Sequence, residues 1–487
     1  MAERLYRLKR LARKNFNVQV KGLDSERWRL ALQADPRLPR NLGQVRQLWR
    51  DLTEHRRRRA PAFDVQVTRG VLRRRIEECG EAAVARFFTA LGSPLLGNRD
   101  LDEIDAMMDA DLPAFDQSLE TDHFVLRWTN SAAHAADNLA DAAIVDETAG
   151  YLETAWAQYN SVFGRAPYPP AGATKIDVNF WDIGGYGVAS PPDGPISFDA
   201  ENWQSQPGIR QPTSAHELFH KLQYAFGYRT LWAPVAPYQW FSEGSASWAE
   251  VYVWQRVSGA YKMTDLFTTP DLDLYNASYR ALPFWMFFDT RQRDAVDDVP
   301  LVGYLQRYEL TGQEETALGE AIDADWPANN VYGQLDTFFA LFSRERRIGA
   351  WRQTPTGGQP YATILGPDGA AITPALTMSE VPLASGDAYS NAGNVSGLGS
   401  DYYHFVFDPN ADGETLTISV TAAAGGDYSY YSIWEKGGAF KKATFPFVAT
   451  GSFTFSQPLE IATADALVFI ISGRGTGGGY TIDASIT

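Results

Sequence analysis

The chain has 487 residues, more than one hydrophobic core usually supports, so about two to four domains are expected. Hydrophobic residues make up 45% and charged residues 21%, a globular composition that excludes a largely disordered chain. The single cysteine, Cys79, excludes an internal disulfide and a cysteine-ligated metal site. No apolar run approaches the roughly 18 residues that cross a bilayer, so no transmembrane segment is expected.

Charge is distributed unevenly along the chain, whose net charge is −16. Residues 1–75 contain 21 Lys and Arg against 7 Asp and Glu, a balance of +14, and the remainder contains 22 against 52, a balance of −30. The basic segment is therefore expected to lie against the acidic body or against another acidic partner. The run at residues 56–59 lacks the interleaved aromatic residues or the recognisable fold of a nucleic-acid site, so no nucleic-acid partner is expected.

Residues 1–118 are predicted to form a basic helical region, with its clearest helix over residues 71–91. The first part of this region lacks the apolar core of a secretory signal peptide. We therefore expect a protein that is cytoplasmic as synthesised and that either stays there or is exported by a leaderless route. In that case the region is either an inhibitory pro-like segment or a leader that loads the chain into secretion or injection machinery.

From residue 119 onwards the pattern changes to alternating strands and helices. Apolar–polar alternation predicts strands, and apolar residues that recur every three to four positions predict amphipathic helices. We expect an α+β domain over residues 119–350, whose last part is a helical subdomain. The expected strands are 123–129, 175–183 and 195–199, and the expected helices are 146–163, 213–227 and 242–257.

The last part of the chain has a different composition. Residues 351–400 are rich in Gly, Pro, Ser and Thr, which is typical of a linker. Residues 401–487 contain short strands separated by turn residues, which predicts an all-β sandwich. Within it, Asp408, Asp412 and Glu414 lack the spacing of an EF-hand calcium loop, and a hairpin turn explains them better.

The most specific spacing in the chain occurs in the segment TSAHELFH, which ends at His220. On a helix, His216 and His220 are four positions apart and lie on one face. Two neutral imidazoles on one face can bind a single Zn²⁺ ion, and Glu217 lies where it can take a proton from the attacking water. The sequence therefore predicts a zinc site with Glu217 as general base. The alternative is a surface helix with an incidental pair of histidines.

A third ligand is expected from the following helix, which contains the sequence WFSEGSASWAE. A catalytic zinc site keeps three protein ligands and one open position, and a carboxylate is a common third ligand. Glu243, which lies 23 residues after His220, fits that role. Glu250 is expected to hydrogen-bond a zinc-binding histidine from outside the ligand set and to fix its tautomer. The alternative for Glu243 is a carboxylate that the helix dipole favours near a helix start.

Together these two segments resemble the gluzincin clan of zinc metallopeptidases, to which thermolysin and the aminopeptidase N group belong. In those aminopeptidases the third ligand lies in a W-L-N-E-G-F-A segment with another acidic residue seven positions later. Here Trp240–Ala246 reads W-F-S-E-G-S-A, and Glu250 is the later acid. The two segments also resemble a group of bacterial metallopeptidases, many of which have β-sandwich tails. The resemblance covers about residues 120–350 and implies a zincin-like fold with Zn²⁺ bound by the two histidines and Glu243.

The same resemblance bears on the type of peptidase. The 23-residue spacer before Glu243 is longer than is usual in the aminopeptidases. Their exopeptidase segment, G-x-M-E-N, has no counterpart in this sequence, which favours an endopeptidase. Stabilisation of the reaction's oxyanion needs a donor. Tyr279, which stands before an apolar helix as the aminopeptidase tyrosine does, is preferred over Tyr275, and the alternative is a core or rim tyrosine.

An extended substrate needs a free sheet edge beside the metal. In zincins an edge strand before the metal-binding helix pairs with the substrate backbone. Residues 194–199, GPISFD, are expected to be that strand, the alternative being an ordinary edge strand. The glycine-rich loop at residues 184–187 would then lie near the rim of the cleft.

These features predict a zinc-dependent endopeptidase that acts on protein or peptide substrates. The alternative is a non-catalytic, delivered or adhesive binding protein whose zinc site is vestigial or structural. The presence of Glu217 favours the enzyme, because a structural zinc site does not need that carboxylate. The remaining histidines are expected to be structural or surface residues, since none has ligand spacing to another: His55, His123, His134 and His404.

Overall fold

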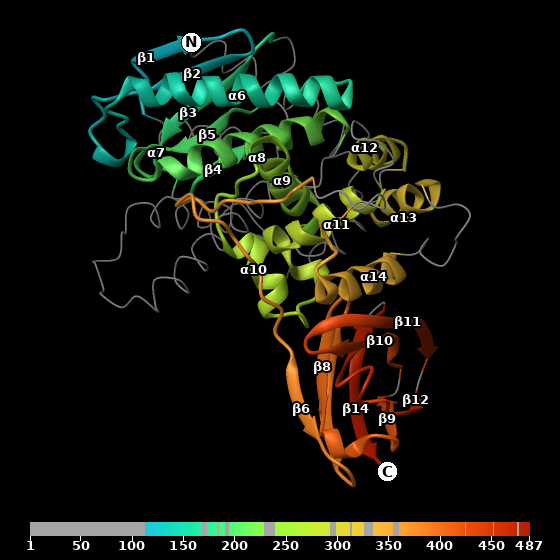
Figure 1. The fold of residues 1–487 in the computed structure, drawn as a ribbon. Coiled ribbons are helices and arrows are strands. Elements are labelled where there is room, and N and C mark those ends of the chain that lie inside the picture. The colour runs from blue at the N-terminus through green and yellow to red at the C-terminus, as the bar shows by residue number, and fades with distance from the viewer. Residues whose placement is uncertain are drawn as a thin grey trace, which may run out of the picture. The chain divides into compact units, whose positions relative to one another are not determined.

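The computed structural model of the chain has an α+β fold (Figure 1). The predicted basic region, with its helix at 71–91, lies outside the described residues up to residue 112. Strand β1 (Gln117–Glu120) contains the expected boundary at residue 118. The structure describes residues 113–167, 173–183, 185–189, 194–227, 239–292, 299–311, 314–325, 335–353, 360–423, 425–450, 452–474 and 477–487.

The chain divides into two compact units, each made of segments that are distant in sequence. Helix α9 (Gln239–Trp254) is continuous across one of the unit boundaries. The units therefore differ from the expected divisions after residues 118, 350 and 400. The first unit comprises Met1–Tyr238, Ala249–Gly259 and Leu365–Ala370, and the second comprises Gln239–Trp248, Ala260–Ile364 and Ala371–Thr487.

A five-stranded mixed sheet with strand order β1-β2-β3-β5-β4 belongs to the first unit. The inner strands β2, β3 and β5 are parallel, and the edge strands β1 and β4 are antiparallel to their neighbours. The inner strands are almost wholly buried, which explains their continuous apolar sequences. The three predicted strands of this region are confirmed. Besides β1, the strands are β2 (Phe124–Trp128), β3 (Ile176–Trp181), β4 (Gly187–Ala189) and β5 (Ile196–Asp199).

Two long helices, α6 (Ala142–Phe163) and α8 (Pro207–Ala225), pack on each other and on this sheet (Figure 1). Asp141 precedes helix α6 and its side chain caps a first-turn N–H, and Gly164, with a φ of 60°, follows the last helical residue. Helix α8 begins with proline, which the first turn tolerates, and so starts earlier than predicted. Two short elements complete this layer: η1 (Ala135–Asp137) and α7 (Ala200–Ser205).

Aromatic packing holds the helical part of the second unit together. The ring of Phe287 lies 4.9 Å from that of Phe338 and 5.3 Å from that of Phe342, measured between centroids. The predicted helical stretch before residue 350 is confirmed. Among the described residues, no helix combines the length and apolarity needed to cross a membrane. The elements are α10 (Tyr261–Thr268), η3 (Leu274–Asn276), η4 (Ser278–Ala281), α11 (Leu282–Gln292), α12 (Pro300–Thr311), α13 (Glu314–Asp325) and α14 (Leu335–Ile348).

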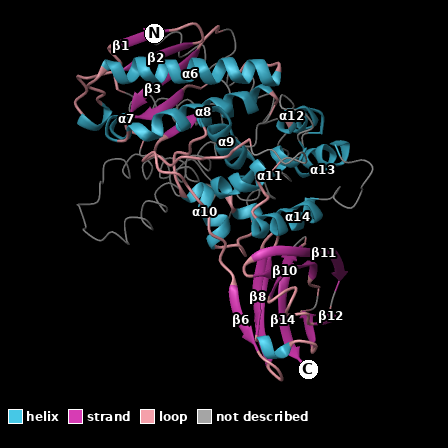
Figure 2. Ribbon diagram, in the orientation of Figure 1, coloured by secondary structure: helices cyan, strands magenta, loops and turns pink. Residues whose placement is uncertain are grey.

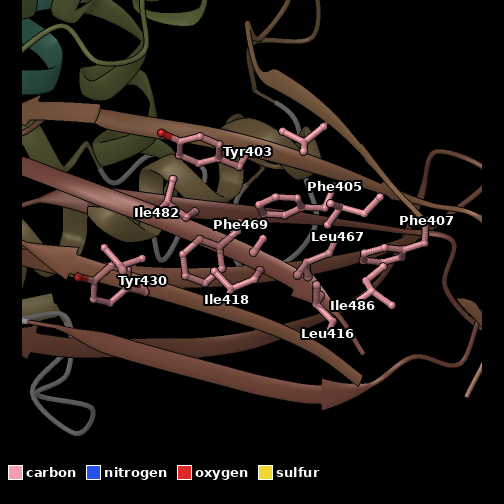
Figure 3. Packing of buried hydrophobic residues seen from close by; sticks show 14 of the residues in the cluster. Tyr403, Phe405, Phe407, Leu416, Ile418, Tyr430, Leu467, Phe469, Ile482 and Ile486 are labelled. Atoms are coloured by element: carbon pink, nitrogen blue, oxygen red, sulfur yellow. The ribbon is translucent and has the colours of Figure 1, made fainter. Parts of the chain in front are cut away.

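The C-terminal region is β-sandwich-like, with a five-stranded sheet (β11-β10-β13-β8-β6) and a four-stranded sheet (β12-β9-β14-β7) (Figure 2). Alternating residues point inward, so that Phe405 and Leu467 of one sheet meet Ile418 and Ile482 of the other in a shared core (Figure 3). The strands are β6 (Ser379–Leu383), β7 (Ala388–Ser396), β8 (Ser400–Phe407), β9 (Thr415–Ala422), β10 (Asp427–Lys436), β11 (Ala439–Thr450), β12 (Phe453–Pro458), β13 (Ala466–Gly473) and β14 (Gly477–Ile486), with η5 (Pro409–Ala411) between β8 and β9.

The range predicted as a linker, residues 351–400, contains two strands of this region. Strand β6 pairs with β8, and β7 pairs with β14. The Gly and Asn residues of β7 have low strand propensity, so the long-range pairing determines their conformation. The sandwich therefore begins at Ser379 rather than at residue 401.

Candidate metal centre

Helix α8 places the HExxH residues in the interior of the first unit. His216, Glu217 and His220 are 3%, 4% and 8% exposed. The two imidazole centroids are 4.9 Å apart, which the four-residue spacing allows because it places both residues on one face. A surface helix with an incidental histidine pair would expose these rings, so the burial argues against that alternative.

Glu250 of α9 lies beside the first histidine. Its Oε1 is 2.9 Å from His216 Nδ1, and its side chain is fully buried. The carboxylate is itself fixed, because Ser258 donates to it from the backbone N–H at 2.7 Å and from Oγ at 3.2 Å. Gln255, with a φ of 49°, ends the helix and turns the chain back. This arrangement directs the other ring nitrogen, Nε2, away from Glu250.

Gln223 hydrogen-bonds the second histidine. His220 Nδ1 is 2.8 Å from Gln223 Oε1, an acceptor, so Nδ1 carries the proton and Nε2 keeps its lone pair. No motif in the sequence marks this residue. The available signal was its position three residues after His220, on the same helix face.

These two contacts predict that zinc affinity falls when either of them is removed. Replacing Glu250 or Gln223 by Leu should weaken zinc binding by about 10- to 100-fold, because each ring then loses the acceptor that orients it. Isothermal titration with Zn²⁺ measures the change. Replacing Gln204, an amide on α7 in the same unit, is the control and should leave affinity unchanged. Equal affinities in all three variants would contradict the orienting role.

Glu243 joins the two histidines in a candidate metal-binding group. One possible ligand atom from each of His216, His220 and Glu243 lies within 4.8 Å of the other two. Glu243 is seven residues before Glu250 on the same helix, so both carboxylates lie on nearly the same face of α9. Among the residues that the structure describes, this is the one such group of three.

The donor set fits Zn²⁺. Two imidazoles and one carboxylate are the ligands of many catalytic zinc sites, and three protein ligands leave a position open. The charge also fits, because Glu217, Glu243 and Glu250 are only 4%, 8% and 0% exposed. Buried carboxylates need positive partners, and a divalent cation would supply one.

The sheet edge that faces this helix is β4, not the predicted segment at 194–199. Strand β5 pairs with β3 on one side and with β4 on the other, so it is an inner strand. The edge strand comes from the end of the glycine-rich segment, where sequence analysis expected a loop. Its three residues are too few to produce an alternating pattern, and the pairing with β5 makes them a strand.

Strand β4 lies directly against Glu217. A Cβ atom on Gly187 would meet Glu217 Cγ at 2.8 Å, its Oε1 at 2.9 Å and Thr213 Cγ2 at 3.0 Å. The two distances to Glu217 are shorter than real Cβ contacts, so any larger residue at this position would force the Glu217 side chain to shift.

Gly187→Ala should therefore displace the Glu217 carboxylate. The expected result is a roughly 100-fold fall in kcat at unchanged zinc content, because a displacement of about 1 Å in a reacting group has an effect of that size. Gly185→Ala is the matched control, since a Cβ there meets nothing within 4 Å. Peptide hydrolysis and metal analysis of both variants give the comparison. A Gly187→Ala protein that is as active as the control would show that Glu217 does not need its present position.

Tyr279 lies in η4, directly before α11. This segment packs on α9 next to the third candidate ligand, since a Cβ on Gly244 would meet Ala281 Cβ at 2.9 Å. The close approach explains the glycine that follows Glu243.

The Tyr279 side chain is buried and faces a cation. Lys262 Nζ lies 4.5 Å from its ring centroid. Tyr275 packs differently, with its ring edge-on to Trp240 at a centroid distance of 5.7 Å. The assignment of Tyr279 as oxyanion donor stays a prediction.

The other described histidines each lie near one carboxylate. His123 Nδ1 is 2.6 Å from Glu153, His134 Nδ1 is 3.9 Å from Asp137, and His404 Nε2 is 3.5 Å from Glu435 Oε2. His55 lies outside the described residues. In the sandwich, Asp408 accepts a hydrogen bond from the Asn410 N–H at 2.7 Å, as a turn residue does.

Comparisons with known proteins do not assign a family. No family model matches the chain, and no curated protein matches it. Among solved structures, a periplasmic inhibitor of g-type lysozyme from Aeromonas hydrophila is 13% identical over 23% of this chain and 100% of its own, with a TM-score of 0.16. The pre-peptidase C-terminal domain of a Bacillus anthracis collagenase is 14% identical over 23% and 97%, also at 0.16. Scores this low carry no argument about fold or function.

Proposed function

We propose that this chain is a zinc-dependent endopeptidase whose catalytic part is a zincin-like domain. The observation that carries the proposal is the convergence of His216, His220 and Glu243, with Glu217 next to the first ligand and buried beside a sheet edge. Two imidazoles and a carboxylate would hold Zn²⁺ and leave one position open. A merely structural site has no use for the adjacent Glu217.

The residues of the site have separable roles. When bound, Zn²⁺ would supply a Lewis acid that polarises the scissile carbonyl and lowers the pKa of water. Glu217 accepts a proton from the attacking water and returns it to the leaving nitrogen. Glu250 and Gln223 contact the Nδ1 atoms of the two imidazoles, so the Nε2 atoms would be the ones to hold the ion. Tyr279 is proposed to donate to the oxyanion.

Strand β4 is proposed to bind the substrate backbone. It is an edge strand, and its neighbour on the other side is β5. Because Gly187 contacts Glu217, a peptide paired with β4 would lie beside the general base. Backbone pairing recognises any extended chain, which suits an endopeptidase acting on protein or peptide substrates.

Metal analysis combined with peptide digestion tests the proposal. The purified full-length chain should contain about one zinc per molecule and should cleave an unstructured protein internally, and mass spectrometry would locate the cuts. A chelator should abolish cleavage, and added Zn²⁺ should restore it. A protein that binds zinc but leaves a peptide library intact would instead support a non-catalytic binding protein with a structural zinc site.

A further inference from the structure

Two side chains of α8 just beyond the second histidine reach both arms of the β4–β5 hairpin. The Tyr224 hydroxyl donates to Ala189 O at 3.1 Å, at the end of β4. Lys221 Nζ donates to Gly194 O at 2.6 Å, just before β5. Both residues are buried, at 5% and 0% exposed. The helix that carries the candidate ligands thus contacts the edge strand's hairpin at two backbone carbonyls.

The register shows which backbone groups of β4 remain available for a substrate. Asp199 N donates to Tyr186 O at 3.2 Å, so residues 186 and 199 are a hydrogen-bonded pair. Bonded pairs alternate along an antiparallel ladder, so Val188 bonds β5, and Gly187 and Ala189 direct their N–H and C=O groups to the free edge. The Ala189 carbonyl already accepts a hydrogen bond from the Tyr224 hydroxyl.

The chemistry of Lys221 indicates a role beyond packing. Burial of an ammonium group is costly, and an apolar side chain of similar length would fill the same space more favourably. The Lys221 ammonium group forms a charge-assisted hydrogen bond with Gly194 O, just before β5. This bond is stronger than one from a neutral donor. Lys221 Nζ also lies 5.6 Å from the Tyr224 ring, so the two anchors are coupled.

We propose that Lys221 and Tyr224 are positioning residues, which hold the β4 edge at a fixed distance from Glu217 so that an extended substrate pairs through Gly187. The inference rests on the proposed peptidase function. Because the Ala189 carbonyl already accepts a hydrogen bond from Tyr224, Gly187 is the main residue of β4 that can hydrogen-bond a substrate backbone. The substrate is therefore an extended peptide segment whose backbone, rather than its side chains, is recognised at this edge.

Tyr224→Phe and Lys221→Met test the anchors, and Tyr428→Phe is the matched control. Tyr428 in the sandwich also donates its hydroxyl to a backbone carbonyl, Gly479 O, at 2.9 Å. Each anchor variant should raise KM for an extended peptide by roughly 3- to 10-fold, the effect of one lost hydrogen bond, with kcat within about twofold. Zinc content should equal that of the wild type. The control should change neither constant.

Hydrogen exchange gives a second readout that does not depend on activity. The Val188 amide should exchange roughly 3- to 10-fold faster in both anchor variants than in the control, because the hairpin is released from α8. Unchanged exchange and unchanged KM in the zinc-loaded variants would overturn the proposal. If the zinc-loaded wild type cleaves no peptide, the proposed function fails, and the exchange rates still decide whether these residues hold the strand.

Discussion

Glu217→Gln is expected to lower peptide hydrolysis by about 10²- to 10⁴-fold without loss of zinc, because the amide cannot accept the proton of the attacking water. The substitution preserves size, so the contacts with Gly187 and Thr213 remain sterically possible. Single-turnover digestion of a peptide, with metal content determined on the same samples, measures both quantities.

The matched control for this variant is Glu380→Gln, which makes the same change on an exposed strand of the sandwich. It should hydrolyse peptides at the wild-type rate. Wild-type activity in zinc-loaded Glu217→Gln would remove Glu217 from the mechanism. A fall in activity matched by an equal fall in zinc content would make it a determinant of metal binding instead.

The HExxH helix could be predicted from sequence because its information is local. The four-residue spacing of His216 and His220 fixes their common face on any α-helix. Glu243 and Glu250 are likewise fixed relative to each other by their seven-residue spacing on α9. What spacing could not show is that these two helix faces converge. The resemblance to gluzincins supplied that expectation, and the structure brings the ligand atoms within 4.8 Å.

The parts that sequence analysis missed depend on long-range pairing. Strand β4 has only three residues, and its identity as the edge comes from its register with β5 and its contact with α8. Strand β7 reads as a linker because its residues lack a continuous apolar face, yet it pairs along nine residues with β14. The β-strand propensity of a residue describes how well it fits a pleated surface. It does not show which other strand the residue will pair with.

Gln223 was missed for another reason. Glutamine is an ordinary helix residue, and its position three residues after His220 shows only that the two side chains share a helix face, not that they are bonded. In the structure its amide oxygen determines which nitrogen of His220 carries the proton. Glu250 was predictable because the spacing of a known motif singled it out. Contacts that orient ligands are therefore read from sequence only where a family pattern marks them.

Three carboxylates are buried around the candidate metal centre. Glu217, Glu243 and Glu250 are all less than 9% exposed, and like charges raise one another's energy in a low-dielectric interior. Zinc binding should therefore stabilise the fold as well as enable chemistry. At free zinc about 100 times the dissociation constant, linkage gives roughly 2.7 kcal/mol of added stability.

Glu243→Ala tests whether bound zinc stabilises the fold through this ligand. The metal-free stability of each protein is the baseline against which the effect of zinc is measured. With metal, zinc affinity should fall by more than about 100-fold, beyond the effect expected for orienting residues. Thermal unfolding with and without Zn²⁺ should show the zinc-dependent rise in Tm in the wild type and not in the variant.

The control is Glu345→Ala, which removes a buried carboxylate that lies 2.7 Å from Arg291. This variant should lose stability to about the same extent with and without zinc, because it breaks a buried ion pair and leaves the metal ligands in place. Its zinc-dependent rise in Tm should therefore survive. If Glu243→Ala retains the same rise, Glu243 is not a ligand. The two histidines would then lack the third ligand expected from α9, and the catalytic assignment would lose its basis.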